Sequence, residues 1–149
     1  MTDFDPADTG KAVSGREENL TGQLKAAGLR PTRQRLSLGG LLFGNGDRHV
    51  TAETLHEEAM AAGIHVSLAT VYNTLHQFTD AGLLRSLPVN GSKTYFDTNT
   101  TRHHHFYCES GGVLSDVPSG AMEIAGLPEA PEGMEITSVD VVVRIRPKA

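Results

Sequence analysis

The stretch SLATVYNTLHQFTDAG, residues 67–82, decides the fold. Ser67 is a residue type that caps helix N-termini, and Gly82 is a residue type that ends helices. At 100° per residue, one narrow arc between them holds four apolar residues, Leu68, Val71, Leu75 and Phe78. The sequence therefore predicts a helix that turns one apolar face into a core.

From Ala69 to Gln77, the opposite arc of this helix has no charged side chain, and no Glu or Lys occurs on it. It carries Ala69, Thr70, Asn73 and Gln77, with Tyr72 and His76 on its flanks. A solvated helix face is usually charged, whereas Asn and Gln can pair with adenine in the major groove of DNA. The face therefore favours nucleic-acid recognition, and an ordinary polar surface is the alternative.

The residues around this helix predict a winged helix. Helical periodicity or capping patterns precede it at 17–28, 32–44 and 51–63. Two strand-like runs follow, LLRSLPV and KTYFD, joined by the hairpin signal NGS at 90–92. The predicted fold class is α+β, with a winged-helix DNA-binding domain over residues 17–97.

The remaining residues predict a polar arm and a second domain. Residues 1–16 are polar and lack an apolar period, as in a disordered segment. From residue 98 to 149 the pattern alternates, with strands expected at 104–110, 111–117 and 134–146 and a short helix at 119–126. We expect a small C-terminal α/β dimerisation domain, whose long last strand pairs with or packs against a second copy.

Composition limits the possible function classes. The 149 residues carry a net charge of −5, but Lys25, Arg30, Arg33 and Arg35 fall within eleven residues that contain no acid. DNA could therefore be met locally rather than by the whole surface. A single cysteine excludes an internal disulfide, and no apolar run reaches the length of a membrane span. We expect a cytoplasmic protein without a membrane partner.

Four segments together resemble the ferric uptake regulator family. They are GLRPTRQR at 28–35, RHVTAETLH at 48–56, SLATVYNTLHQFTDAGLLR at 67–85, and the histidine cluster before Cys108. Within that family, Asn73 and the terminal VDVVVRIR are similar to the iron response regulator branch. The resemblance implies a bacterial homodimeric transcriptional regulator of iron homeostasis genes that binds a palindromic operator in double-stranded DNA, and not an enzyme.

The resemblance also implies roles for residues of the first domain. Tyr72 and Asn73 match the base-contacting pair of the family, and Arg30 matches a basic residue that reaches the minor groove. Arg35 closes the GLRPTRQR motif and is expected to be structural or phosphate-binding. With the polar helix face, the expected DNA-binding set is Arg30, Arg35, Ala69, Thr70, Tyr72, Asn73 and Gln77.

A metal site between the two domains follows from the resemblance, at His49, Asp97, His103, His105 and Asp116. If residues 103–105 form a strand, His103 and His105 share one face and His104 points away. Three imidazoles and two carboxylates without sulfur suit Fe²⁺ or Mn²⁺ and also accept Zn²⁺. One ion bound by both domains would fix the angle between them, and with it the spacing of the two recognition helices in a dimer.

Two further ligand hypotheses involve the histidine run. His104 and Glu123 match a second, more variable metal site of the family, which would lack its usual C-terminal histidine here. The iron response branch senses haem, and imidazole is a common axial haem ligand, so residues 103–105 are candidates for haem binding. The structural zinc site, which the family builds from four thiolates, is not expected, because Cys108 is the only cysteine.

Several alternatives remain open on the sequence alone. Within the same family the chain could respond to manganese, to zinc or to peroxide. His103, His105 and Glu109 also fit the first metal motif of cupin enzymes, but no histidine follows His105 and four helices precede residue 83. A winged helix that binds only protein is a further alternative, and Cys108 could be a core residue or a redox thiol.

Overall fold

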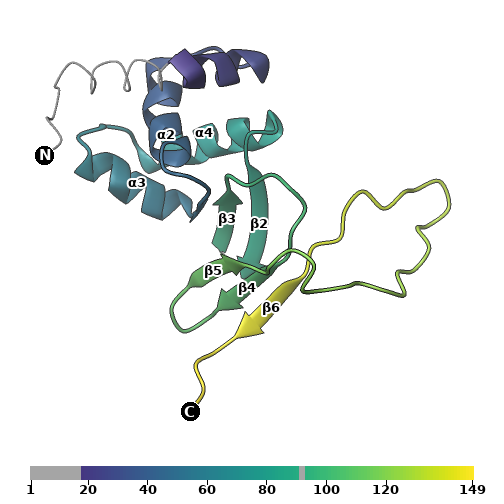
Figure 1. The fold of residues 1–149 in the computed structure, drawn as a ribbon. Helices are drawn as coiled ribbons and strands as arrows, with labels where there is room; N and C mark the ends of the chain where they lie inside the picture. The colour runs from purple at the N-terminus through teal and green to yellow at the C-terminus, as the bar shows by residue number, and fades with distance from the viewer. Residues whose placement is uncertain (1–17, 91–92) are drawn as a thin grey trace, which may run out of the picture. The chain divides into compact units, whose positions relative to one another are not determined.

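The computed structural model describes residues 18–90 and 93–149 and divides into two compact units between Thr100 and Thr101 (Figure 1). The arm expected at 1–16 and the hairpin turn at 91–92 lie outside the described residues. The described residues of the first unit form helices and a sheet and those of the second form a sheet, and the α+β fold class is confirmed.

Helices make up the first half of the first unit. Residues 18–26 are helical and are followed by α2 (Arg33–Phe43), α3 (Ala52–Ala61) and α4 (Leu68–Asp80). Thr32, Thr51 and Ser67 cap the last three by accepting a hydrogen bond from the backbone N–H three residues on. The helix after residue 67 was therefore predicted correctly, including the glycine that follows it, since Gly82 takes a φ of 81°.

A three-stranded antiparallel sheet completes this unit, in the order β1 (His49–Val50), β3 (Lys93–Asp97), β2 (Arg85–Asn90). The helices and the sheet share one core, in which Leu24, Leu38, Leu55, Val71, Leu75, Phe78 and Phe96 are fully buried. Of the predicted apolar arc of α4, only Leu68 is exposed, because it is the first residue of the helix. The shared core fixes α4 against the sheet that carries the candidate metal ligands.

The second unit contains a three-stranded sheet in the order β5 (Val113–Asp116), β4 (His105–Cys108), β6 (Val142–Ile145). β4 pairs antiparallel with β5 and parallel with β6. Tyr107 and Leu114 are buried at its centre. The first two strands were predicted, although β4 begins one residue later than expected.

Two expectations for the second unit are wrong. The predicted helix at 119–126 does not form in this described segment, in which Gly120 and Gly126 take left-handed φ values of 79° and 72°. The last strand, expected at 134–146, is only β6, because in the described part of the chain the ladder with β4 covers residues 142–145, with one more backbone hydrogen bond from His105 to the carbonyl of Val141.

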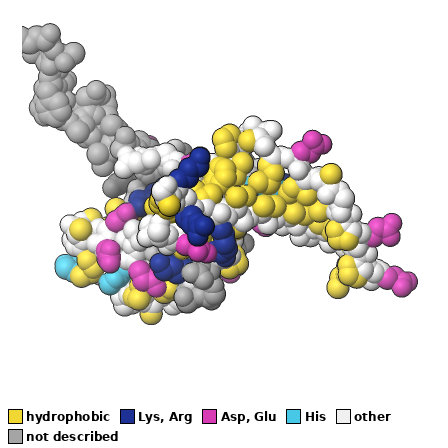
Figure 2. All heavy atoms as spheres, turned by 90° about the horizontal axis from the view of Figure 1, so that it is seen from below, with side chains coloured by type: hydrophobic (Ala, Val, Ile, Leu, Met, Phe, Trp, Pro, Cys, Tyr) yellow, Lys and Arg dark blue, Asp and Glu magenta, His cyan; other side chains and the backbone are white. Residues whose placement is uncertain are grey.

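Residues 117–141 leave several large apolar side chains in solvent. Met134 is 72% exposed, Leu127 51% and Ile136 48%. The space-filling view shows hydrophobic side chains gathered along this part of the unit, at the right of the picture (Figure 2). None of the described helices is long and apolar enough to cross a membrane.

Candidate metal centre and recognition helix

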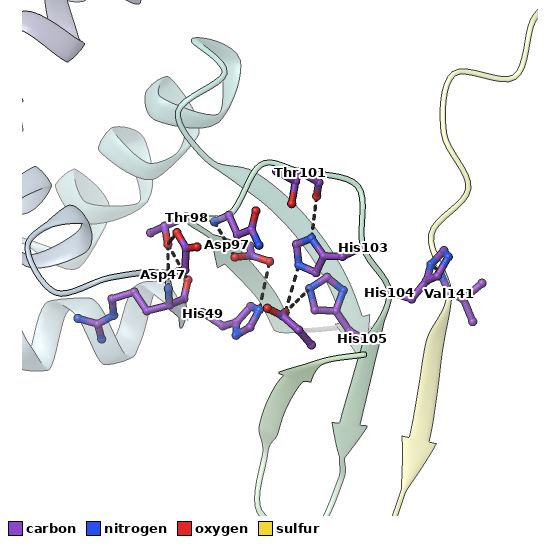
Figure 3. Close-up of polar contacts among 12 residues, drawn as sticks. Asp47, His49, Asp97, Thr98, Thr101, His103, His104, His105 and Val141 are labelled. Carbon is purple, nitrogen blue, oxygen red and sulfur yellow. Dashed lines mark hydrogen bonds and ion pairs between the residues drawn. The ribbon is translucent and has the colours of Figure 1, made fainter. Parts of the chain in front are cut away.

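In the first unit, the pairing of β1 with β3 brings His49 and Asp97 together. The register places His49 directly opposite Asp97, so that the two side chains are cross-strand neighbours. His49 Nε2 lies 3.1 Å from Asp97 Oδ2, and the side chain of Asp97 is only 2% exposed (Figure 3). A buried carboxylate needs a positive or hydrogen-bonding partner, which a protonated His49 or a bound cation would supply on this side of Asp97.

Backbone and side-chain contacts hold this pair in place. The backbone N–H of Asn99 donates to Asp97 Oδ1 at 2.9 Å, which leaves Oδ2 directed at His49. Next to His49, the backbone N–H of Arg48 donates to Thr98 Oγ1 at 2.8 Å, and the Arg48 guanidinium forms a 2.6 Å ion pair with Glu58 of α3. These contacts fix the candidate ligands to the helical part of the unit.

In the second unit, the same arrangement recurs in the other sheet. His105 lies directly opposite Asp116 in the pairing of β4 with β5, and its Nε2 is 3.4 Å from Asp116 Oδ1. His103, two residues before His105, also directs its Nε2 at that oxygen, at 3.1 Å (Figure 3). The ligand atoms of these three residues lie within 4.8 Å of one another. Antiparallel pairing of a histidine with an aspartate thus builds both groups.

A backbone contact selects the nitrogen that His103 can offer to an ion. His103 Nδ1 lies 2.7 Å from the carbonyl oxygen of Thr101, so Nδ1 carries the hydrogen and donates it. The Nε2 lone pair of the neutral ring then faces a carboxylate oxygen, which is favourable only with a proton or a cation between them. Metal-ligating histidines are commonly fixed by such a second contact.

His104 points away from this group, as the alternation of a strand predicts. Its Nδ1 accepts a hydrogen bond from the backbone N–H of Val141 at 3.2 Å (Figure 3). Glu123, its expected partner in a second metal site, is exposed in the irregular segment before β6. Among the described residues, the candidate metal ligands do not include His104 or Glu123.

The donor chemistry of the two groups fits a divalent ion. Ligand atoms about 2.0–2.2 Å from one ion lie roughly 3.0–3.5 Å from each other. The nitrogen–oxygen separations of 3.1 and 3.4 Å within the groups fall in this range. Imidazole and carboxylate donors without sulfur match Fe²⁺, Mn²⁺ and Zn²⁺.

On α4, the predicted DNA-contacting residues lie on the exposed face but are not all free. Ala69 and Asn73 are exposed, and Thr70 is half-buried. The Tyr72 hydroxyl donates to Glu53 Oε1 of α3 at 2.7 Å. Gln77 Oε1 accepts from Arg35 Nε at 3.2 Å and from Arg35 Nη2 at 3.0 Å, while Arg35 Nη1 donates to the carbonyl of Arg30 at 2.9 Å. Side chains of α2 and α3 thus hold two of the predicted contact residues.

Several of these supporting residues gave little signal in the sequence. The sequence did not point to Glu53 or Glu58, because each contacts a side chain outside its own helix, 19 and 10 residues away. It did not point to Thr101 either, because only the backbone carbonyl of Thr101 contacts His103. The contact of Asn99 had a recognisable signal, because an aspartate in a turn, here Asp97, often accepts a hydrogen bond from the backbone N–H two residues further on.

Cys108 is half-buried on β4, and its thiol contacts the side chain of a neighbouring residue. A hydrogen bond with the hydroxyl of Ser110, at 3.3 Å, lowers the pKa of Cys108, with the backbone N–H of Gly111 adding to the effect. The expected alternative of a fully buried core residue is not what the structure shows.

Comparisons with known proteins agree on one family. The model of the ferric uptake regulator family matches residues 26–144. A ferric uptake regulation protein of Shigella flexneri is 34% identical over 117 residues, which are 77% of this chain and 79% of the relative. A peroxide-responsive repressor of Staphylococcus epidermidis is 33% identical over 106 residues, 71% of this chain and 70% of the relative.

A solved structure is similar over most of the chain. The ferric uptake regulator from Pseudomonas aeruginosa with manganese has a TM-score of 0.65 and 26% identity, over 87% of this chain and 98% of that one. The chain therefore belongs to the ferric uptake regulator family of metal-responsive transcriptional regulators. This family is not one of enzymes, and the cupin-like alternative is set aside.

Proposed function

We propose that this protein is a DNA-binding transcriptional regulator of iron homeostasis genes that responds to Fe²⁺ or Mn²⁺. One observation carries the proposal: an antiparallel ladder pairs a histidine with an aspartate in each unit, His49 with Asp97 and His105 with Asp116. Relatives named for iron uptake and for peroxide response match at nearly the same identity. The donor set, rather than likeness to one relative, therefore supports the choice of metal.

The two groups are each too small to satisfy an ion of high coordination number. The first unit offers one imidazole and one carboxylate, and the second offers two imidazoles and one carboxylate. Together they offer five ligands, which suits five- or six-coordinate Fe²⁺ or Mn²⁺. An ion bound by both groups would restrain one unit relative to the other, and this restraint is the proposed switch.

The DNA interface in this proposal is the exposed face of α4 with the basic segment before α2. Asn73 has an exposed amide, and the residues one turn before and after it on α4, Ala69 and Gln77, are uncharged, which suits contact with a base edge. Arg30 is exposed and adds a positive charge for the phosphate backbone or the minor groove. A palindromic operator would be read by two such helices, one from each protomer.

A homodimer is proposed from the apolar side chains of the second unit. Met134, Ile136 and Val139 are exposed, and they belong to the segment just before β6. Contact with a second copy would remove this apolar surface from water.

Haem sensing, expected from the iron response branch, remains a prediction with less support. Each imidazole of the run already has a contact: His103 with Thr101 and Asp116, His104 with the N–H of Val141, and His105 with Asp116. A haem ligand would have to give up one of these contacts. A titration of the wild type and of the variant with all three histidines changed to alanine, followed by the Soret band, tests this prediction.

The metal proposal is tested by occupancy. Asp97→Ala and His105→Ala should each lower the Mn²⁺ content of the purified, Mn²⁺-loaded protein sharply, because each removes a ligand. His104→Ala is the matched control, because its ring faces Val141 instead. Elemental analysis decides the matter, and equal loss from all three variants would contradict the assignment.

The DNA proposal is tested by selection of bound duplexes from a random library with Mn²⁺-loaded protein. Asn73→Ala should weaken binding to the selected duplex by about 1–3 kcal/mol and relax its sequence preference at one base pair. Arg30→Ala should weaken all duplexes by a similar factor. An unchanged ratio of specific to non-specific affinity in Asn73→Ala would overturn the assignment of α4 as the recognition helix.

A further inference from the structure

Arg35 and Gln77 form a clamp between α2 and α4. Arg35 is anchored near the start of α2, where its backbone N–H donates to Thr32 Oγ1 at 3.3 Å. Its guanidinium then makes three contacts: two to Gln77 Oε1, at 3.0 and 3.2 Å, and one to the carbonyl of Arg30, at 2.9 Å. Arg35 thus ties the basic loop before α2 to the C-terminal half of α4.

The chemistry of the clamp fixes the orientation of the Gln77 amide. A guanidinium can only donate hydrogen bonds, so the amide must turn its oxygen, and not its nitrogen, toward Arg35. Both donors from Arg35 meet the same oxygen, and a carbonyl oxygen has two lone pairs. The acceptor capacity of Gln77 is therefore used inside the protein, and the Nε2 of this exposed side chain keeps two N–H groups for donation.

A donor-only glutamine cannot read adenine. Bidentate recognition requires the amide oxygen to accept from the adenine N6 amino group while the amide nitrogen donates to N7. Gln77 lacks the first of these capacities as long as Arg35 holds its oxygen. The interpretation of Gln77 as an adenine contact, which followed from the residue type alone, therefore does not fit the clamp.

The position of Gln77 along α4 favours a different acceptor. Recognition helices contact base edges mainly with their N-terminal residues, and Gln77 is three residues from the end of α4 at Asp80. It lies eight residues after Ala69, which is roughly 12 Å along the helix axis. The adjacent guanidinium places a positive charge next to the Gln77 side chain, which favours an anionic acceptor, although the exposed Asp80 lies three residues further along α4.

We infer that Gln77 and Arg35 form a contact for one phosphate of the DNA backbone, with Gln77 as donor and Arg35 as the cation that orients it. This inference rests on the proposed DNA-binding function and deepens it. Arg35 has five N–H groups, of which three are used in the clamp. The remaining two, with the two of Gln77 Nε2, can meet the oxygens of a single phosphate. The pair positions the protein on the duplex and reads no base.

The test compares Gln77→Met with Asn73→Ala on the Mn²⁺-loaded full chain. Methionine keeps the length of the side chain and removes the donor. Gln77→Met should weaken the selected duplex and an unrelated duplex by the same factor, roughly tenfold, as for loss of a hydrogen bond to a charged group. Asn73→Ala should change the ratio between the two duplexes. Gln23→Met, at another exposed glutamine of the same unit, controls for the substitution itself.

A second experiment locates the phosphate. Duplexes are prepared with one neutral methylphosphonate at each backbone position in turn, and their affinities are measured by fluorescence anisotropy. One position should weaken the wild type and leave Gln77→Met unaffected. Arg35→Met should lose sensitivity at the same position and lower the salt dependence by about one phosphate contact. Free inorganic phosphate at the same ionic strength should not compete, because a single site of this kind depends on the rest of the duplex.

The inference is overturned if Gln77→Met changes the preference at one base pair, or if no methylphosphonate position distinguishes it from the wild type. Failure of the proposed function has a different signature, because then the Mn²⁺-loaded wild type itself selects no duplex. The two failures are therefore distinguishable in one set of measurements.

Discussion

At the scale of single residues, the contact between Tyr72 and Glu53 makes the surface of α4 sensitive to pH. The Tyr72 hydroxyl donates to the Glu53 carboxylate at 2.7 Å. This hydrogen bond is the main cause that lowers the pKa of Glu53 below its ordinary value of 4.5 and raises the pKa of Tyr72 above 10.0. The contact is therefore fully formed only in the pH range between the lowered pKa of Glu53 and the raised pKa of Tyr72.

The sign of the pH effect follows from linkage. Because the pKa of Glu53 is lowered by folding, the contact stabilises the protein above the ordinary glutamate pKa, and this contribution is lost as the pH falls through the lowered value. Because the pKa of Tyr72 is raised, the same contribution is lost as the pH rises through the raised tyrosine value.

We predict that Tyr72→Phe returns the pKa of Glu53 toward its ordinary value. The carboxyl carbon resonance of Glu53, followed by NMR between pH 2 and 7 in wild type and variant, measures the change. Phenylalanine keeps the ring, whose stacking with His76 at 6.4 Å between centroids is then a control for local structure. Identical titrations in the two proteins would show that the hydrogen bond does not form in solution.

At the scale of elements, α2 contains two adjacent glycines that have different roles. A methyl group on Gly39 would meet Leu20 Cδ1 and Cδ2 of the preceding helix, both at 3.1 Å. A methyl group on Gly40 would meet nothing within 4 Å. Gly39 therefore allows close helix packing, whereas Gly40 only costs helix propensity.

We predict that Gly40→Ala raises the free energy of unfolding by about 0.5–1 kcal/mol, because alanine loses less backbone entropy in a helix. Gly39→Ala should gain less or destabilise the protein, because Leu20 has to move. Urea denaturation followed by circular dichroism measures both. A larger gain from Gly39→Ala than from Gly40→Ala would contradict the packing described for this pair.

At the scale of the whole molecule, the proposed switch depends on one ion being shared by both units. We predict that the wild type binds one Mn²⁺ per chain and that Mn²⁺ raises the apparent melting temperature, because a ligand that binds only the folded protein stabilises it. His49→Ala and Asp116→Ala remove ligands from different units, yet each should lower affinity at the same ion. Isothermal titration calorimetry measures stoichiometry and affinity together.

The variant that combines His49→Ala with Asp116→Ala distinguishes a shared metal site from two separate metal sites. If one ion is shared, the loss of Mn²⁺ binding free energy in the double variant should differ from the sum of the losses in the two single variants, because the ligands act as a unit. His65→Ala is a matched control at an exposed histidine outside both groups. Two ions per chain, with each variant losing only one, would refute the shared site.

The sequence by itself determined the local structure, because local structure depends on local chemistry. The caps at Thr32, Thr51 and Ser67 and the apolar arc of α4 were readable, since each depends on residues within one or two turns. The opposite directions of His104 and its two neighbours followed from the two-residue period of extended backbone. The ligand types were readable only through likeness to a family, as no spacing relates His49 to Asp97.

The tertiary structure decided what depends on contacts between distant segments. The last strand stops at the four residues of β6 because a strand needs a hydrogen-bonding neighbour, and the predicted helix at 119–126 is absent because Gly120 and Gly126 take left-handed conformations. The pairing registers bring each histidine to its aspartate. The interpretation of Gln77 differs most between sequence and structure. Its residue type allows it both to donate and to accept hydrogen bonds, and only the contact with Arg35, 42 residues away in the sequence, uses its acceptor oxygen.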